Sequence, residues 1–256
     1  MFCRKSSGID VNLSPLRGRE HRQLRIGGWV PFSTVDHPGR FGAVVFVQGC
    51  PWRCGYCHNP HLQSRRCSAS VPLAWSDVLS WLASRRGLLD SVVFSGGEPL
   101  VDPSLKQAVQ RVKSLGFEVA LHTAGMYWDR LRDLVSDVDW VGLDVKAPLD
   151  DELTYERVTG APLSAWATLQ SLEILQQHAV NFECRTTVHP QWLSVPDLVH
   201  MADDLAARGV QRWVLQRARP LQPHADQVDE ASLTSDIVSS AVLAQLQQRI
   251  AHVVLR

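Results

Sequence analysis

The chain has 256 residues, of which 45% are apolar and 20% are charged, and its 26 basic side chains balance 26 acidic ones. This length and apolar content suit one or two domains with a full hydrophobic core. The balanced charge argues against a dedicated nucleic-acid binder or a polybasic membrane binder.

The chain carries no sign of export or membrane insertion. No run of about 18 apolar residues occurs, so no transmembrane helix is predicted. Residues 1–25 are polar and lack the apolar stretch of a secretory signal. We interpret 1–25 as a polar leader and 26–256 as one domain. We expect a cytoplasmic protein with neither a nucleic-acid nor a membrane partner.

The elements predicted in chain order alternate between strand and helix. The apolar run AVVFVQG (43–49) is typical of a buried parallel strand, and 73–87 has the apolar spacing of a helix. The same patterns then predict strand 91–97, helix 102–116, strand 117–123, helix 127–136, strand 138–146, helix 163–178, strand 181–188, helix 195–209 and strand 212–218. A last amphipathic helix is predicted over about 231–252.

Six strands that alternate with helices imply parallel βα units. They span about 43–218, which at roughly 30 residues a unit gives six units. A closed eight-unit barrel needs about 250 residues for the barrel itself. We therefore predict the α/β class, and within it a partial (β/α)6 TIM-like barrel whose parallel sheet stays open.

Unusual polar residues and glycines gather where the predicted strands end. Ligands of parallel αβ folds bind at the carboxyl ends of the strands, so these residues predict one shared site. They are Cys50 after the first strand, Gly96, Gly97 and Glu98 at the second, His122 and Thr123 at the third, Asp144 and Lys146 at the fourth, and Arg185 in the fifth.

The six cysteines are Cys3, Cys50, Cys54, Cys57, Cys67 and Cys184. A disulfide framework would distribute pairs along a small secreted chain, whereas here three cysteines form one C-x3-C-x2-C cluster. A zinc site completed by His58 or His61 is one interpretation. The favoured one is an iron–sulfur cluster held by three thiolates, which leaves one iron open to a small molecule.

This motif, with Tyr56 before its last cysteine, resembles the radical S-adenosylmethionine (SAM) superfamily. The stretch FSTVDHPGRFGAVVFVQGCPWRCGYCHNP (32–60) resembles the opening of the glycyl-radical-enzyme activating enzymes. SGGEPL (95–100) is similar to their glycine-rich turn and LDVK (143–146) to their fourth-strand motif. Within that group, the chain looks most like the activating proteins of anaerobic ribonucleoside-triphosphate reductases. The resemblance covers about 26–220.

The resemblance implies the cofactors and the role of each site residue. One [4Fe–4S] cluster would be held by Cys50, Cys54 and Cys57, and SAM on the open iron would be split to a 5′-deoxyadenosyl radical. Tyr56 would contact the adenine, unless it is only an aromatic side chain packed in the protein. The turn of Gly96, Gly97 and Glu98 would receive the SAM ammonium. Lys146 would bind the SAM carboxylate and Asp144 an ammonium or ribose hydroxyl, unless the two form a structural ion pair. Arg185 would face the ribose or carboxylate.

Two positions depart from the pattern of the activating enzymes. His122 and Thr123 close the third strand, where related enzymes often have Asp in place of His122 to help hold a monovalent cation. A neutral histidine is a poor ligand for a hard cation, so a hydrogen-bonded core histidine is the alternative. His37 stands where the pattern has Gly. Cys67 is expected to be exposed and not a ligand, and Cys184 to lie in the core.

The resemblance implies an oxidoreductase that abstracts hydrogen from a glycine of a partner enzyme. The partner that it favours is a class III ribonucleotide reductase. Cys67 is the only cysteine between Cys57 and Gly96, too few for the ligands of a second cluster. One cluster is therefore expected, with an external electron donor such as flavodoxin or ferredoxin. Two alternatives stay open. One is a radical SAM enzyme acting on a small molecule, in deazapurine or cofactor synthesis. The other is an iron–sulfur or zinc protein that binds or carries electrons.

Overall fold

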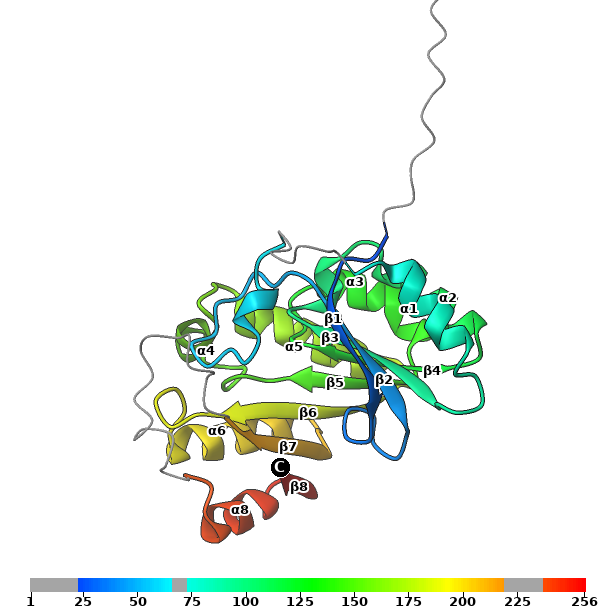
Figure 1. Cartoon of the computed structure of the whole chain (residues 1–256). Coiled ribbons are helices and arrows are strands. Elements are labelled where there is room, and N and C mark those ends of the chain that lie inside the picture. The colour runs from blue at the N-terminus through cyan, green and yellow to red at the C-terminus, as the bar shows by residue number, and fades with distance from the viewer. Residues whose placement is uncertain (1–22, 66–72, 219–236) are drawn as a thin grey trace, which may run out of the picture.

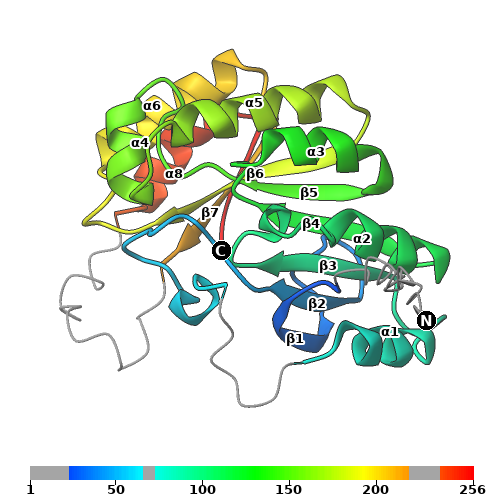
Figure 2. The same ribbon diagram turned by 90° about the horizontal axis from the view of Figure 1, so that it is seen from above.

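The computed structural model describes residues 23–65, 73–218 and 237–256. They form one sheet of eight strands in sequence order, β1 to β8. The sheet is curved and its helices lie along the outer side (Figures 1 and 2). Among the described residues, no helix is long and apolar enough to cross a membrane. Of the predicted leader, only residues 23–25 are described.

The six predicted strands are present and parallel to one another, which confirms the predicted α/β class and its open, partial barrel. Their apolar runs bury both faces of each strand, as a sheet covered by helices requires. The strands are β2 (Gly42–Val47), β3 (Ser91–Gly96), β4 (Glu118–Thr123), β5 (Trp140–Asp144), β6 (Asn181–Val188) and β7 (Arg212–Arg217).

Helices connect these strands where the sequence predicts them. They are α1 (Trp75–Ala83), α2 (Leu105–Ser114), α3 (Trp128–Leu134), α5 (Ser164–Gln177) and α6 (Val195–Ala207). Short 3-10 turns add η1 (Pro60–Leu62), η2 (Pro99–Val101) and η3 (Val135–Asp137). An unpredicted helix, α4 (Glu152–Thr159), precedes α5 and ends at Gly160 in the left-handed conformation.

Both edges of the sheet differ from the prediction. β1 (Ile26–Ser33) pairs antiparallel with β2, and β8 (His252–Leu255) pairs parallel with β7. The predicted helix over 231–252 is wrong at its end, because α8 covers Ser240–Gln247 and a strand begins at His252. Its first part, 231–236, lies outside the described residues.

The two faces of the sheet bury different side chains. The outer face packs against the helices in the main core, to which β2 contributes Ala43, Val45 and Val47. The inner face holds a smaller apolar cluster of Val44, Val93, Ala120 and Trp140. Residues further along the same strands, towards their carboxyl ends, are therefore the ones free to form a site inside the barrel.

Candidate active site

A cavity of about 580 Å³ lies at the carboxyl ends of the strands. Every predicted site residue except Glu98 lines it. The loop after β2 contributes Cys50, Cys54, Tyr56 and Cys57. The strand ends contribute Gly96, Gly97, His122, Thr123, Asp144, Lys146 and Arg185. The residues at the ends of different strands therefore lie around one cavity, as the sequence predicts.

The three cysteines of the motif are free thiols, each partly buried. The backbone N–H of Cys57 donates to the carbonyl of Cys54 at 3.1 Å, which closes a turn between two of them. Burial raises the pKa of Cys54, and it raises the pKa of Cys50 to about 12. Because the thiolate is the metal-binding form, coordination by these two residues would release their protons.

Main-chain and amide hydrogen bonds hold the cysteine loop in place. The Nε2 group of Gln48 donates to the carbonyls of His61 and Ser64 at 3.0 and 2.5 Å. Further along the loop, the N–H of Arg53 donates to the carbonyl of Thr159, the last residue of α4, at 2.8 Å. The loop is therefore fixed both to itself and to a helix that follows β5.

The two glycines of the turn after β3 are required by close backbone contact. Gly96 has φ +128°, and a Cβ there would lie 2.3 Å from the backbone nitrogen of Val47. A Cβ at Gly97 would lie 2.4 Å from the carbonyl oxygen of Gly49. Only glycine fits both positions, so the turn packs directly against β2 and the start of the cysteine loop.

Glu98 is placed differently from the prediction. Its side chain is 1% exposed, and its carboxylate accepts hydrogen bonds from the Leu100 N–H, the Thr123 hydroxyl and the Ala124 N–H at 3.0, 2.7 and 2.8 Å. Burial raises the pKa of Glu98 to about 7, although these hydrogen bonds oppose the rise. The carboxylate joins the glycine turn to β4 instead of facing the cavity.

Asp144 and Lys146 form an ion pair on the cavity wall, with Nζ 3.1 Å from Oδ2. The Lys146 side chain is 11% exposed and lies 5.9 Å from the centre of the Tyr56 ring. Burial alone would lower the pKa of Lys146, but Asp144 and the neighbouring Tyr56 and Cys54 outweigh it and raise the pKa well above its ordinary value. The cavity thus holds a fixed cation beside the cysteine loop.

His122 connects two parts of the cavity wall. Its Nε2 atom lies 2.7 Å from the carbonyl oxygen of Asp36 and 3.1 Å from Nη1 of Arg185. Burial and the Arg185 charge hold the pKa of His122 well below its ordinary value, so the ring is neutral. Arg185 in turn donates through Nε to Glu183 at 3.0 Å.

The guanidinium of Arg185 lies over Gly142 of β5. A Cβ at Gly142 would be 2.8 Å from the Cζ atom of Arg185, so this glycine makes room for the side chain. The guanidinium also lies 4.8 Å from the centre of the Trp140 ring. Arg185 points into the barrel, as expected, and the adjacent Cys184 lies in the outer core.

Sequence reasoning missed several residues of the cavity wall, among them Trp52, Ser95, Thr187 and Arg256. Thr187 is two residues beyond Arg185 on β6, so the two-residue period of a strand could have found it. No local signal pointed to Arg256, because it follows β8, a strand that the sequence analysis did not predict.

An open α/β barrel with three cysteines at its carboxyl edge is the architecture of a cofactor-dependent enzyme. The model of the Radical SAM superfamily matches residues 44–192, more than half of the chain. The chain therefore belongs to the radical SAM superfamily. Its cofactors are those of that superfamily, a [4Fe–4S] cluster and SAM.

Curated relatives include glycyl-radical-enzyme activating enzymes. A putative glycyl-radical enzyme activating enzyme of Methanocaldococcus jannaschii is 29% identical over 183 residues, 69% of this chain and 73% of that protein. The pyruvate formate-lyase-activating enzyme of Clostridium pasteurianum is 35% identical over 131 residues, 49% of this chain and 53% of that enzyme. The 7-carboxy-7-deazaguanine synthase of Methanopyrus kandleri is 32% identical over 154 residues, 52% of this chain and 60% of that enzyme. The chain thus spans little more than half the length of two of these relatives.

Solved structures share the fold. Streptococcus suis SuiB bound to the precursor peptide SuiA matches with a TM-score of 0.58 at 12% identity, over 83% of this chain and 48% of that one. A TYW1 structure with a lysine-pyruvate adduct matches with a TM-score of 0.55 at 15% identity, over 82% and 74%. At such identities, the likeness establishes the barrel and nothing about substrates.

The residues of the cavity fit the two cofactors of the superfamily. Three thiols supply the ligands that iron–sulfur clusters take, and the volume of about 580 Å³ suits a ligand of SAM's size. Lys146 and Asp144 offer opposite charges to a zwitterion. In the part of the chain that the structure describes, no three His, Cys, Asp or Glu side chains lie close enough to hold a metal ion, so the fit of Cys50, Cys54 and Cys57 to a cluster rests on their ligand type and on their place in one cavity.

Proposed function

We propose that this chain is an activating enzyme that forms a glycyl radical in a partner enzyme. The observation that carries the proposal is the convergence of three cysteines, the glycine turn and the Asp144–Lys146 pair on one cavity. The activating enzymes among the relatives support the choice of reaction.

Each wall of the cavity has a role in this proposal. Cys50, Cys54 and Cys57 hold the cluster, and Lys146 binds the SAM carboxylate. Asp144 and the carbonyls of the glycine turn take the ammonium or a ribose hydroxyl. When bound, the cluster and SAM would use one electron from an external donor to release methionine and supply the 5′-deoxyadenosyl radical that removes a hydrogen atom.

The neighbouring side chains complete the SAM pocket. Tyr56 lies against the adenine. Neutral His122 and Arg185 close the side of the cavity near Asp36, where they face the ribose or the carboxylate.

The partner we propose is a class III ribonucleotide reductase, activated through a loop that carries the target glycine. The sheet is open between β1 and β8, which leaves a route for such a loop. The T-V-D and Y-C-H-N flanks of the motif support this group of enzymes. A flavodoxin or a ferredoxin supplies the electron.

The test mixes the reduced, cluster-loaded protein with SAM and an anaerobic ribonucleotide reductase in the absence of oxygen. We expect a doublet electron-paramagnetic-resonance signal from the partner, together with 5′-deoxyadenosine. Replacing the target glycine of the partner with alanine should remove the doublet. Release of 5′-deoxyadenosine without any partner radical, for every glycyl-radical enzyme offered, would refute the proposal.

A second candidate is a radical SAM enzyme that acts on a small molecule. The similarity to a 7-carboxy-7-deazaguanine synthase favours it. Stoichiometric consumption of SAM with a small-molecule precursor of a deazapurine or of a cofactor would support it. A purely binding or electron-carrying protein, the candidate of another class, has no use for a glycine turn and an Asp144–Lys146 pair in the cysteine cavity.

A further inference from the structure

Three arginines lie on the outside of the cysteine loop, around the turn η2. Nη1 of Arg65 donates to the carbonyl of Val101 at 3.1 Å, and Nη1 of Arg130 donates to the same carbonyl at 2.8 Å. Nη1 of Arg25 donates to the carbonyl of Arg65 at 3.3 Å. We call Arg25, Arg65 and Arg130 the arginine patch.

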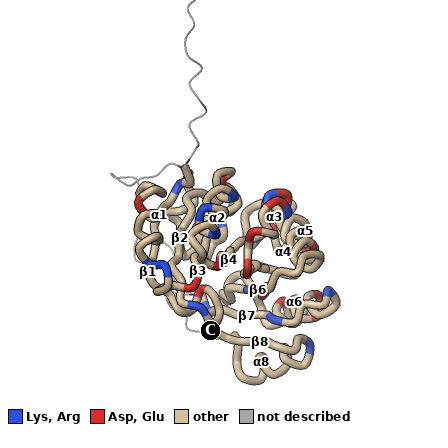
Figure 3. Tube along the Cα trace, turned by 90° about the vertical axis from the view of Figure 1, so that its right-hand side faces the viewer, with Lys and Arg blue, Asp and Glu red and all other residues tan. Residues whose placement is uncertain are grey.

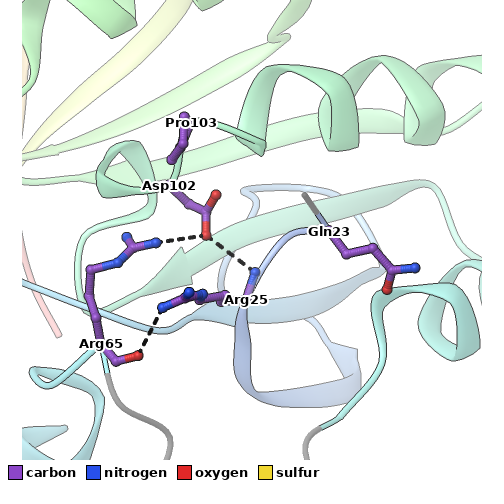
Figure 4. Close-up of a pocket in the computed structure, with 5 residues that line it drawn as sticks. All are labelled: Gln23, Arg25, Arg65, Asp102 and Pro103. Carbon is purple, nitrogen blue, oxygen red and sulfur yellow. Dashed lines mark hydrogen bonds and ion pairs between the residues drawn. The ribbon is translucent and has the colours of Figure 1, made fainter. Parts of the chain in front are cut away.

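The arginine patch has a net positive charge. Arg25 and Arg65 share the acidic neighbour Asp102, whose side chain is 3% exposed and lies 3.3 Å from Nη2 of Arg65, and Arg130 lines a second hollow with Asp102 and Asp133. Figure 4 shows Arg25 and Arg65 beside Asp102, around a hollow of about 220 Å³. Arg25 is exposed, and the Arg65 side chain is 37% exposed. The Asp102 carboxylate accepts from the backbone N–H of Arg25 and from the guanidinium of Arg65, and its single charge offsets only part of the positive charge of these two arginines.

The patch lies close to a cluster ligand. A Cβ at Gly49 would be 2.7 Å from Cγ of Arg65, so the stem of this arginine packs on the residue before Cys50. The N–H of Cys50 donates to the carbonyl of Gln63 at 3.0 Å, two residues before Arg65. A protein seated on the patch would thus approach the cluster from the Cys50 side, away from the cavity where SAM and substrate bind.

The other side of the cysteine loop has a different charge. There the loop meets α4, and the exposed Arg53 and Arg157 are outnumbered by acidic residues. These are Asp150, Asp151, Glu152 and Glu156. Over the whole molecule, basic and acidic segments are scattered (Figure 3), so the contrast between the two sides of the loop is local. An acidic protein would be attracted to the arginine patch and repelled near α4.

We propose that the arginine patch is the docking surface for an acidic one-electron carrier protein that reduces the cluster. One electron leaves the carrier, which is oxidised by one unit, and enters the cluster, which is reduced by one unit. The inference rests on the cluster that membership of the superfamily establishes and does not depend on a glycyl-radical partner.

The test compares two double variants, R25Q/R65Q and R25K/R65K. Cluster reduction by a flavodoxin hydroquinone is followed by loss of visible absorbance, at low and at high ionic strength. We expect R25Q/R65Q to be reduced about tenfold more slowly at low ionic strength, with a flatter dependence on salt. R25K/R65K keeps the charge and should stay near the native rate. In the cluster-free form, R25Q/R65Q should also bind oxidised flavodoxin more weakly than the native protein, whereas R25K/R65K should bind it nearly as well.

Two controls separate docking from damage. Reduced methyl viologen, a small cation, should reduce native protein and R25Q/R65Q at equal rates. R40Q removes an arginine that pairs with Glu118 at 2.8 Å near the amino-terminal ends of the strands, and should leave the flavodoxin rate unchanged. Equal flavodoxin rates and salt slopes in native protein and R25Q/R65Q would overturn the proposal. So would an equal loss of rate with methyl viologen. Neither result bears on which substrate is activated.

Discussion

Among single residues, Lys146 gives a direct test of the proposed SAM site, because its ion pair with Asp144 lies on the cavity wall. Asp144 is the last residue of β5 and Lys146 follows two positions later, and both side chains line the cavity. Replacing Lys146 with alanine should lower the affinity for SAM by roughly 10- to 150-fold. This corresponds to about 1.5–3 kcal/mol for one lost charge-assisted contact. Equilibrium dialysis with the oxidised, cluster-loaded protein measures the change.

The matched control is Lys113→Ala. Lys113 also pairs with an aspartate, Asp139 at 2.7 Å, but on the surface between α2 and the start of β5. Its loss should leave SAM binding unchanged. If the Lys146 and Lys113 variants bind SAM equally well, Lys146 belongs to a structural ion pair and the cavity binds the carboxylate through another group.

His122 should make the stability of the cluster-free protein depend on pH. Its folded-state pKa lies well below the ordinary value of 6.5, because the ring is buried beside Arg185. Below about pH 6.5 the unfolded chain therefore binds a proton that the folded chain does not, and stability falls as the pH falls. Urea unfolding at pH 7.5 and 5.5 should show a smaller loss for His122→Gln than for the native chain.

The exposed His252 on β8 provides the comparison for that experiment. His252→Gln should lose as much stability as the native chain between the two pH values. An equal loss in all three proteins would mean that His122 is protonated in the folded state, and the contact between Nε2 and the Asp36 carbonyl would then be that of an imidazolium.

Among the elements, the turn after β3 is the most constrained by its neighbours. Gly96→Ala would place a Cβ against the backbone of β2, at a φ that L-residues avoid. Gly87→Ala shares the positive φ, at +76°, but has open space around it. We expect the Gly87 variant to lose about 1–2 kcal/mol of unfolding free energy. The Gly96 variant should lose a further 1–3 kcal/mol or so from overpacking.

Urea denaturation of the two cluster-free variants measures this difference. Reconstitution with iron and sulfide should also fail or slow in the Gly96 variant, since the turn packs on the start of the cysteine loop. Equal stabilities of the two alanine variants would show that β2 shifts to accommodate the methyl group, and that the close approach is not a requirement of the fold.

The sequence predicted the interior strands better than the edges, for physical reasons. β2 to β7 are buried on both faces and therefore appear as continuous apolar runs. β1 is IGGWVPFS, with two glycines and a proline that are typical of an edge strand and weaken a strand prediction. β8 has four residues and follows α8 closely, so its apolar residues continued the helical pattern. α4 is short and carries Thr and Val, which favour helices weakly.

The site residues could be predicted where a reactive residue type stands at the end of a predicted strand or in a recognisable motif. Cysteine spacing and strand ends indicated the cavity, and the two-residue period put Asp144 and Lys146 on one face. Glu98 could not be placed in the same way, because Thr123 and Ala124, two of the donors that bury its carboxylate, come from the end of another strand. The contact between His122 Nε2 and the carbonyl of Asp36 likewise joins two residues that are 86 positions apart in sequence.

At the scale of the whole molecule, the cysteine loop joins segments that are distant in sequence. Arg53 is bonded to the end of α4, and a Cβ at Gly55 would lie 2.0 Å from the Trp192 ring in the loop after β6. The Tyr56 ring stacks on His189 of that same loop, with centroids 6.2 Å apart. Fixing the cysteines on a cluster should therefore rigidify α4 and the loop after β6 as well.

Hydrogen–deuterium exchange of the cluster-free and cluster-loaded protein tests this coupling. Loading should slow exchange about tenfold or more, equivalent to about 1.4 kcal/mol of local opening free energy, in three segments. These are the cysteine loop 48–65, the end of α4 at 155–160, and 189–193. The last turn of α2 leads into the amino-terminal end of β4, away from the cavity at the carboxyl ends of the strands, and should keep its rate. Cys57→Ala, carried through the same reconstitution, should show no protection anywhere. Protection confined to 48–65 would mean that the loop moves independently of α4 and Trp192, and that the packing on Gly55 transmits no stability to the rest of the barrel.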